Sequence, residues 1–432
     1  MKHNEGLPIE LQIDILLNSC DVKSLKSLVS ASPSYHRAYL LVRGEVLHAV
    51  LHNYYDGLVD IAEAIAAVRS RGLYAYQISN HDKIIALLDG RRRSEEIRRL
   101  NSPSLKFLPD RPATVDEIME LMRLHDMAVF LLDDFTRTVS CPAWVDRERW
   151  KNDILPLELS RTEKKRLFRA FYRLQTYGNI FGAIETPLGA EPPNGRTGRN
   201  EWHGGNGNFS DEEAWRLFFG TMAPWEVEEF GCLWEHCYER WVEPYSEVSE
   251  NLANSGVMFV CELPAADRPP ATRMVLDTDD LRLCEMDNRD CFVSMGPAFL
   301  VKILREQNFT TRRNLVIGNA DGTASPFTEF WPRWSQDHPF ESALPLLYPA
   351  DRFNVGTDMD ALKEILRSLP PREQPNLAWS WKWLDDHRDY PEVFFDMFDY
   401  GARAQRWKWS YAFWDDERLY DWGTPSDYMS GL

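Results

Sequence analysis

Apolar residues recur at helical spacing over much of this chain, and this feature limits its fold more than any other. The i, i+3, i+4 pattern runs through 57–72, 114–139 and 161–182, as in amphipathic helices that bury one face. The sequence therefore predicts a mainly α fold. A minor irregular or β segment is expected around 252–330, where the pattern shortens and "SGVMFVCEL" has the composition of a strand.

A chain of 432 residues is long enough for two or three domains. We expect an N-terminal helical module at 1–50 and a helical domain at 51–185. A Gly- and Pro-rich stretch at 186–210 is expected to form a surface loop. The remainder, 211–432, is expected to form a mainly helical C-terminal domain that ends in an aromatic tail.

The charge and the cysteine content restrict the compartment and the partners. The net charge of −18 disfavours a generic nucleic-acid or anionic-membrane binder, because an acidic surface repels phosphate groups. Neither a signal-peptide core nor a stretch of about 18 apolar residues is found. The seven cysteines are scattered and odd in number, which is typical of a reducing compartment. We therefore expect an intracellular protein, in the cytoplasm or nucleus, without a membrane partner.

Two groups of residues are candidates for lining a pocket. An acidic pair on a helix resembles part of the metal-binding motif of class I terpene synthases, but an arginine stands where a third acid is needed. In the C-terminal tract, tryptophans alternate with basic residues, as in sites that stack on bases or hold cations. The structural alternatives, an acidic helix end and a tail packed on the body, are favoured. The candidate pocket residues are Asp133, Asp134, Trp407, Trp409 and Trp414.

One basic run is the candidate nucleic-acid contact. Arg91, Arg92 and Arg93 are consecutive and could contact a transfer RNA. Glu95 and Glu96 follow at helical spacing, so a solvated helix face is the favoured interpretation.

A cysteine–histidine cluster could hold a metal ion or supply a nucleophile and a base. Cys232 and His236 are four residues apart, and Cys237 follows. Without a CxxC pair or an HExxH motif, buried cysteines beside a core histidine are the favoured interpretation. Neither a metal ion nor a cofactor is predicted.

Residues 7–50 are predicted to form three short helices. Pro8 suits a first helical position, Asp21 can cap the second helix, and Ser32-Pro33 suits the start of the third. Each helix is too short to bury its apolar face well alone.

This stretch resembles an F-box. Leu7, Pro8 and Glu10 match the family's Leu-Pro-x-Glu opening, and Ile15-Leu16 match its Ile-Leu pair. A second helix with a Leu-x-x-Leu-like pattern follows an acidic turn, and a tyrosine stands where the family usually has tryptophan. The segment "VSASPSYHRAYL" and the later "RLFRAFYRLQTYGNIFG" are similar to fungal F-box-like proteins of unknown function.

The resemblance implies that the module inserts its apolar helices into the SKP-type adaptor of an SCF ubiquitin ligase, while the rest of the chain recruits an unknown protein substrate. The residues expected to bind the adaptor are Leu7, Pro8, Leu11, Ile15, Leu16, Leu25, Leu28, Val29 and Tyr35. A short helical unit with an open apolar face is also what helix-in-groove association requires.

Two alternatives remain open. The chain could be an enzyme of fungal secondary metabolism on an unfamiliar helical scaffold, for example a transfer-RNA-dependent arginine-containing cyclodipeptide synthase. It could also be a scaffold whose N-terminal helices pack permanently into its own core.

Overall fold

The computed structural model describes residues 6–100, 112–188, 222–259, 285–320, 359–369, 373–384 and 406–425, together with 209, 214, 217–219, 262 and 263. These residues are mainly helical, which confirms the predicted fold class, and none of them lies in a β-strand.

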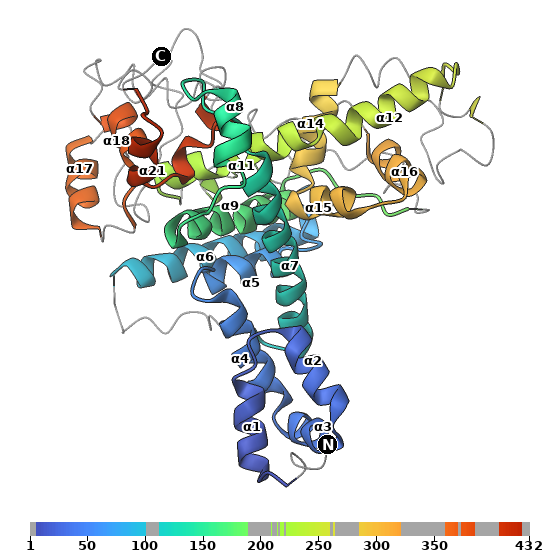
Figure 1. Cartoon of the computed structure of the whole chain (residues 1–432), viewed down its shortest axis with the longest axis vertical. Coiled ribbons are helices and arrows are strands. Elements are labelled where there is room, and N and C mark those ends of the chain that lie inside the picture. Colours follow the sequence, from blue (N-terminus) through green and yellow to red (C-terminus); the bar gives the residue numbers. More distant parts are fainter. Residues whose placement is uncertain are drawn as a thin grey trace.

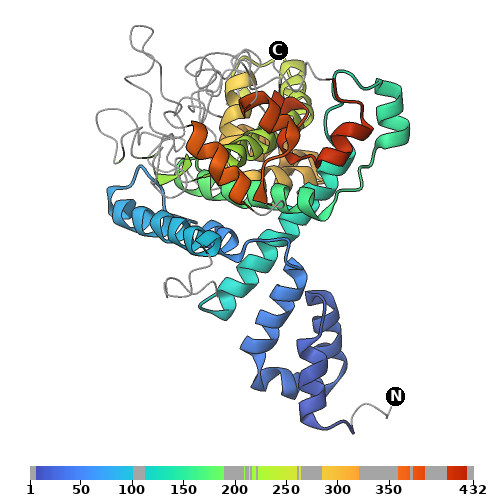
Figure 2. The same ribbon diagram turned by 90° about the vertical axis from the view of Figure 1, so that its left-hand side faces the viewer.

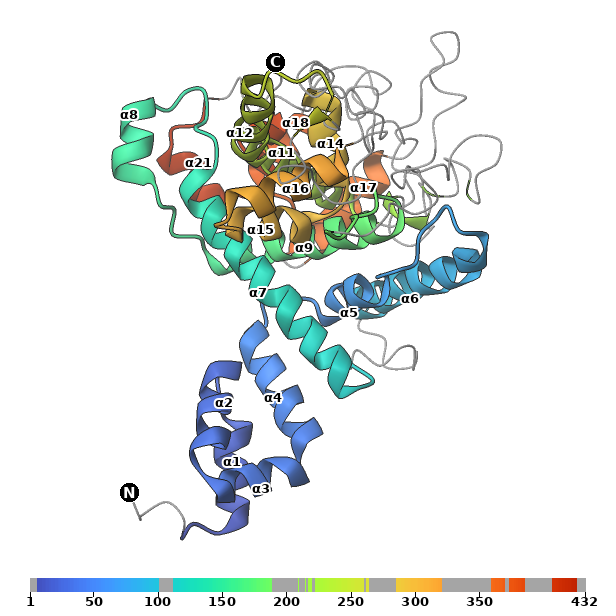
Figure 3. The same cartoon turned by 90° about the vertical axis from the view of Figure 1, so that its right-hand side faces the viewer.

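Four helices form an N-terminal arm that projects from the rest of the molecule (Figures 1, 2 and 3). They are α1 (Ile9–Leu17), α2 (Val22–Ala31), α3 (Pro33–Leu41) and α4 (Arg43–Tyr55). The helix α3 contacts α1, α2 and α4, and α1 also contacts α4. The arm meets the body where α4 packs against α7 (Val115–Thr138). The N-terminal module was expected to end at residue 50. Because α4 continues to Tyr55, the arm is longer than expected.

The body is built around α9 (Arg161–Ile180), which contacts α5, α7, α11, α14 and α15. The side chain of Ser160 caps α9 by accepting a hydrogen bond from the Glu163 N–H, and the Glu163 carboxylate accepts one from the Ser160 N–H. Around α9 lie α5 (Ile61–Arg69), η1 (Ile78–Asn80), α6 (His81–Leu100), α8 (Arg147–Arg149), η2 (Trp150–Ile154), α11 (Pro224–Arg240), α12 (Val242–Asn254), α14 (Glu285–Ser294), α15 (Pro297–Arg305) and α16 (Phe309–Asn319).

The region expected to contain a minor irregular or β segment is helical over most of its described residues and irregular over the rest. The helices α14, α15 and α16 occupy most of 285–320, and the described residues between 255 and 263 form turns and a single bridge. A short apolar run such as "VMFV" is too uniform to show either helical or strand periodicity, so it does not by itself predict a strand. The Gly- and Pro-rich stretch 186–210 lies almost entirely outside the described residues.

The aromatic tail packs on the body, as the favoured interpretation predicted. It follows α17 (Met359–Ser368) and α18 (Leu377–Leu384) and forms η8 (Tyr411–Phe413) and α21 (Asp416–Asp421). Trp407 and Trp414 are fully buried. Gly231 of α11 makes room for Trp407, since a Cβ atom at residue 231 would lie 2.2 Å from the indole.

Candidate docking surface

The turns between the arm helices form largely as their sequence predicts. Asp21 caps α2, and its carboxylate accepts a hydrogen bond of 2.8 Å from the Ser24 N–H. That bond, with others from the Cys20 thiol and the Ser24 hydroxyl, lowers the pKa of Asp21 to about 2. Pro33 opens α3 as predicted, whereas Pro8 is the residue before α1 rather than its first residue.

The expected adaptor-binding residues divide into an inner and an outer set. Leu16, Leu25 and Tyr35 are buried in the arm's own core together with Ala38 and Val46. Their side chains stabilise the arm and are closed to a partner in this conformation. Leu7, Leu28 and Val29 are half-buried, whereas Pro8, Leu11 and Ile15 are exposed.

The outer set forms an apolar stripe on α1. Pro8, Leu11 and Ile15 follow one another at i, i+3 and i+7, so they share one face of the helix, and Leu11 and Ile15 are 48% and 42% exposed. The neighbouring face, with Gln12 and Leu16, is buried. We call Pro8, Leu11 and Ile15 the α1 stripe.

Exposed apolar residues are concentrated in the arm. Eleven large apolar side chains are exposed among the described residues, and five of them lie between residues 9 and 41. Besides the α1 stripe they include Ile9 and the end of α3, where Leu40 and Leu41 are 59% and 69% exposed. Exposed apolar side chains that gather in one small unit are typical of an interaction surface.

The two candidate acids are each engaged by an arginine. Asp133 is exposed and pairs with Arg137 at 3.0 Å. Asp134 accepts two hydrogen bonds from Arg240 of α11, at 2.8 and 3.0 Å. Burial alone would raise the pKa of Asp134, but hydrogen bonds from His236 and Arg240 lower it to about 2. This carboxylate therefore ties α7 to α11.

The three candidate tryptophans are packing residues. Trp409 is 7% exposed and Trp407 and Trp414 are fully buried. The Trp407 indole donates to Glu228 at 2.6 Å, and the Trp414 indole donates to the Trp409 carbonyl at 2.8 Å. A cavity of about 750 Å³ lies elsewhere, along α4, and none of the five candidate residues lines it.

Arg91 lies inside the body, and so differs from the solvated helix face that was the favoured interpretation and is closed to a nucleic acid in this conformation. Its side chain is buried, pairs with Glu63 of α5 at 3.2 Å and lies over the ring of Phe218. The side chains of Arg92 and Arg93 lie outside the described part of the chain. Because Arg91 is buried, no described side chain of this run presents a positive charge to a phosphate group.

The cysteine–histidine cluster is structural, as the favoured interpretation predicted. Cys232, His236 and Cys237 are buried in α11, and burial raises the pKa of both thiols. Such thiols stay protonated and are poor nucleophiles. No group of three or more His, Cys, Asp or Glu side chains in the described residues is arranged to hold a metal ion.

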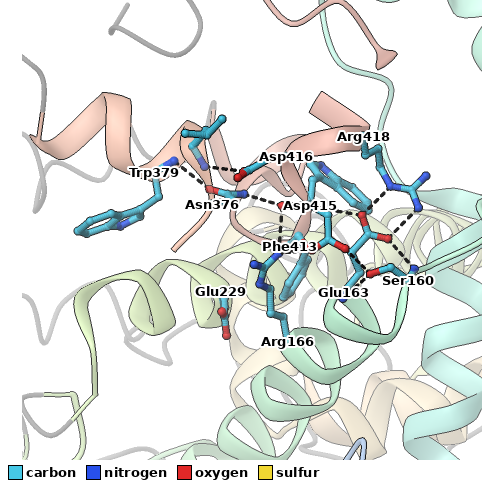
Figure 4. A network of polar contacts seen from close by, with 12 residues as sticks. Ser160, Glu163, Arg166, Glu229, Asn376, Trp379, Phe413, Asp415, Asp416 and Arg418 are labelled. Atoms are coloured by element: carbon cyan, nitrogen blue, oxygen red, sulfur yellow. Dashed lines mark hydrogen bonds and ion pairs between the residues drawn. The ribbon is translucent and has the colours of Figure 1, made fainter. Parts of the chain in front are cut away.

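One feature that sequence reasoning missed is a ladder of buried ion pairs along α9. Glu163, Arg166, Arg169 and Arg173 face acidic and basic partners from α5, α11 and the tail. Figure 4 shows the end of the ladder at Glu163 and Arg166. At one end Arg418 binds Glu163 at 2.6 Å, and Arg166 binds Asp415 at 3.1 Å.

At the other end, two arginines share one glutamate. Arg169 and Arg173 each bind Glu226 at 2.9 Å, Arg169 also binds Glu229, and Arg173 binds Glu63. Burial would raise the pKa of Glu63, but Arg173 and Arg91 lower it to about 2. The spacing of the arginines along α9 is the sequence signal for these ion pairs. It does not identify their partners, because those lie 53 to 110 residues away in sequence.

Comparison with known proteins adds no relative. No family model, no curated protein and no solved structure matches the chain. None of the helices in the described part of the chain is both long and apolar enough to cross a membrane.

Proposed function

We propose that the arm is an F-box-like docking unit that binds an SKP-type adaptor of an SCF ubiquitin ligase, and that the body binds the protein to be recruited. The observation that carries this proposal is the α1 stripe, which stays exposed although the arm already has a buried core of its own. The resemblance of residues 7–39 to the F-box supplies the identity of the partner.

The arrangement of the arm supports a docking role over the scaffold alternative. A helical unit that served only the chain's own core would pack its apolar stripe against the body. Here α1 and α2 both pack against α3, α1 and α3 pack against α4, and the arm projects from the body (Figures 1 and 3). Leu11 and Ile15 therefore remain available to a groove on another protein.

The enzyme alternative has less support. Arg91 is enclosed, the candidate pocket residues are separately engaged, and the buried carboxylates of Glu226 and Glu229 are paired with arginines of α9. A transfer-RNA-dependent synthase would need cations open to phosphate and a pocket with converging polar groups.

The test is a comparison of adaptor binding between the parent chain and two variants. Leu11→Asp combined with Ile15→Asp places two charges on the α1 stripe without touching the buried face. Ile78→Asp is the matched control, because Ile78 is 80% exposed and lies in the body. We expect the double variant to lose adaptor binding by about a hundredfold or more, since each charge would be buried unpaired.

The control variant is expected to bind the adaptor as the parent does. The proposal is abandoned if the parent chain is not retained by the adaptor, or if the double variant binds as tightly as the parent. Far-UV circular dichroism of all three proteins establishes that the arm remains helical.

A further inference from the structure

A second group of side chains outside the docking surface has the chemistry of a binding site. The cavity of about 750 Å³ runs along α4, and its wall includes Glu45, His48 and His52. Its apolar part comes from Leu51 of the same helix, from Val59 of the connection to α5 and from Ile61, the first residue of α5. This volume is in the range of cavities that hold small ligands.

The two histidines are placed to act together. His48 and His52 are four residues apart on one helix, so their imidazoles lie on the same face, one turn from each other. Two histidines at this spacing are the arrangement with which helical zinc sites bind their ion. Neither imidazole forms a hydrogen bond or an ion pair in the described structure, so both ring systems are available to a ligand.

The charge nearby favours a cation over an anion. Glu45 lies three residues before His48 on the same helix and lines the same cavity. A carboxylate at this place repels a phosphate or carboxylate ligand and attracts a metal ion. Imidazole nitrogen suits zinc, copper and nickel, whereas calcium and magnesium prefer oxygen ligands.

We propose that His48 and His52 form a two-histidine clamp for a divalent transition-metal ion on the wall of this cavity. No group of three potential ligands is preformed among the described residues, so the ion keeps water at its remaining positions.

Calorimetric titration of the untagged full-length chain with Ni²⁺ near neutral pH tests the clamp. All proteins carry Cys20→Ser, because Cys20 is an exposed thiol that would bind the same ion. We expect one ion to bind the parent, and His48→Ala and His52→Ala each to weaken that binding by about tenfold or more. His36→Ala is the matched control, since His36 is exposed on α3, and it is expected to bind as the parent does.

Neither alanine variant removes a hydrogen bond, so each should fold as the parent does without metal. Ni²⁺ should raise the unfolding temperature of the parent and of His36→Ala but not that of the other two variants. The clamp is refuted if the parent does not bind Ni²⁺, or if either His48→Ala or His52→Ala binds it as tightly as the parent. Adaptor binding is not part of this readout, so the two proposals stand or fall separately.

Discussion

At the scale of residues, the most consequential feature is the pairing of buried charges. Arg173 is fully buried and lies between Glu63 and Glu226, with 2.9 Å to each. A buried ion pair adds little net stability by itself, but removing one partner leaves the other charge buried and unpaired. The ladder along α9 therefore makes the body sensitive to single substitutions.

Arg173→Met keeps the apolar stem of the side chain and removes its charge. We expect a loss of about 3 to 5 kcal/mol in the free energy of unfolding, measured by urea denaturation. Arg161→Met is the control, because the Arg161–Asp56 pair is exposed and should contribute less than about 1 kcal/mol. Equal losses in the two variants would contradict this account of the ladder.

Glu235 makes stability depend on pH. Burial, followed by the nearby Glu239 carboxylate, raises the pKa of Glu235 to about 7 in the folded chain. The folded-state pKa of Glu235 lies above the unfolded value of 4.5. Its contribution to the free energy of unfolding is therefore fully present below about pH 4.5 and is lost as the pH rises through 7.

Glu235→Gln mimics the protonated carboxyl group at every pH. We expect the variant to match the parent at pH 4.5 and to exceed its unfolding temperature at pH 8, in a thermal unfolding series. Glu243→Gln, an exposed change on α12, should follow the parent throughout. A Glu235→Gln variant that shows the parent's pH dependence would show that this group does not cause it.

At the scale of elements, the arm is fixed to the body by aromatic packing around His125 of α7. Tyr54 and Tyr55, at the end of α4, place their rings 4.6 and 4.7 Å from the imidazole. From α9, Phe168 packs at 5.1 Å and the Tyr172 hydroxyl lies 2.9 Å from Nδ1. Burial lowers the pKa of His125 to about 4, so the ring stays neutral near pH 7.

Tyr55→Ala removes one of the aromatic rings packed around His125, the joint between the arm and the body. Tyr55 is 4% exposed, so we expect a loss of about 3 kcal/mol in unfolding free energy. Small-angle scattering should also show a broader distribution of distances between arm and body. Tyr420→Ala, at a position 62% exposed, should change stability by less than about 0.5 kcal/mol. A Tyr55→Ala variant as stable as Tyr420→Ala would contradict the role given to the joint.

Much of the helical content could be predicted from local pattern. The cap of Asp21, the start of α3 at Pro33 and the bounds of α7 and α9 each depend on neighbours within a few residues. Between Pro224 and Asn254 the chain forms two helices, α11 and α12, with a break at Trp241. The apolar pattern continues across that break and so does not reveal it.

The candidate site was only partly predictable for a related reason. Periodicity placed Leu11, Ile15 and Leu16 on the same helix but did not show which of them would face the core of the arm. Leu16 turned inward with Gln12, a polar residue that would ordinarily mark the outer face. The partners of Arg91 and Arg173 are far away in sequence, so local pattern made these arginines look solvent-facing.

At the scale of the whole molecule, the chain combines a projecting arm with a larger helical body (Figure 2). The body's ion pairs and buried tryptophans bring α5, α9, α11 and the tail together, while the arm joins it through α4 and α7. This division matches the two parts of the proposed function. An adaptor on the α1 stripe would be held away from the surface that receives the recruited protein.

Hydrogen exchange of the full-length chain, with and without the SKP-type adaptor, tests this central claim most directly. If the arm is the docking unit, the adaptor slows amide exchange in α1 and in the last turn of α3. Exchange in α9, α11 and the tail is then unchanged. Unaltered exchange in α1, or protection confined to the body, would contradict the account.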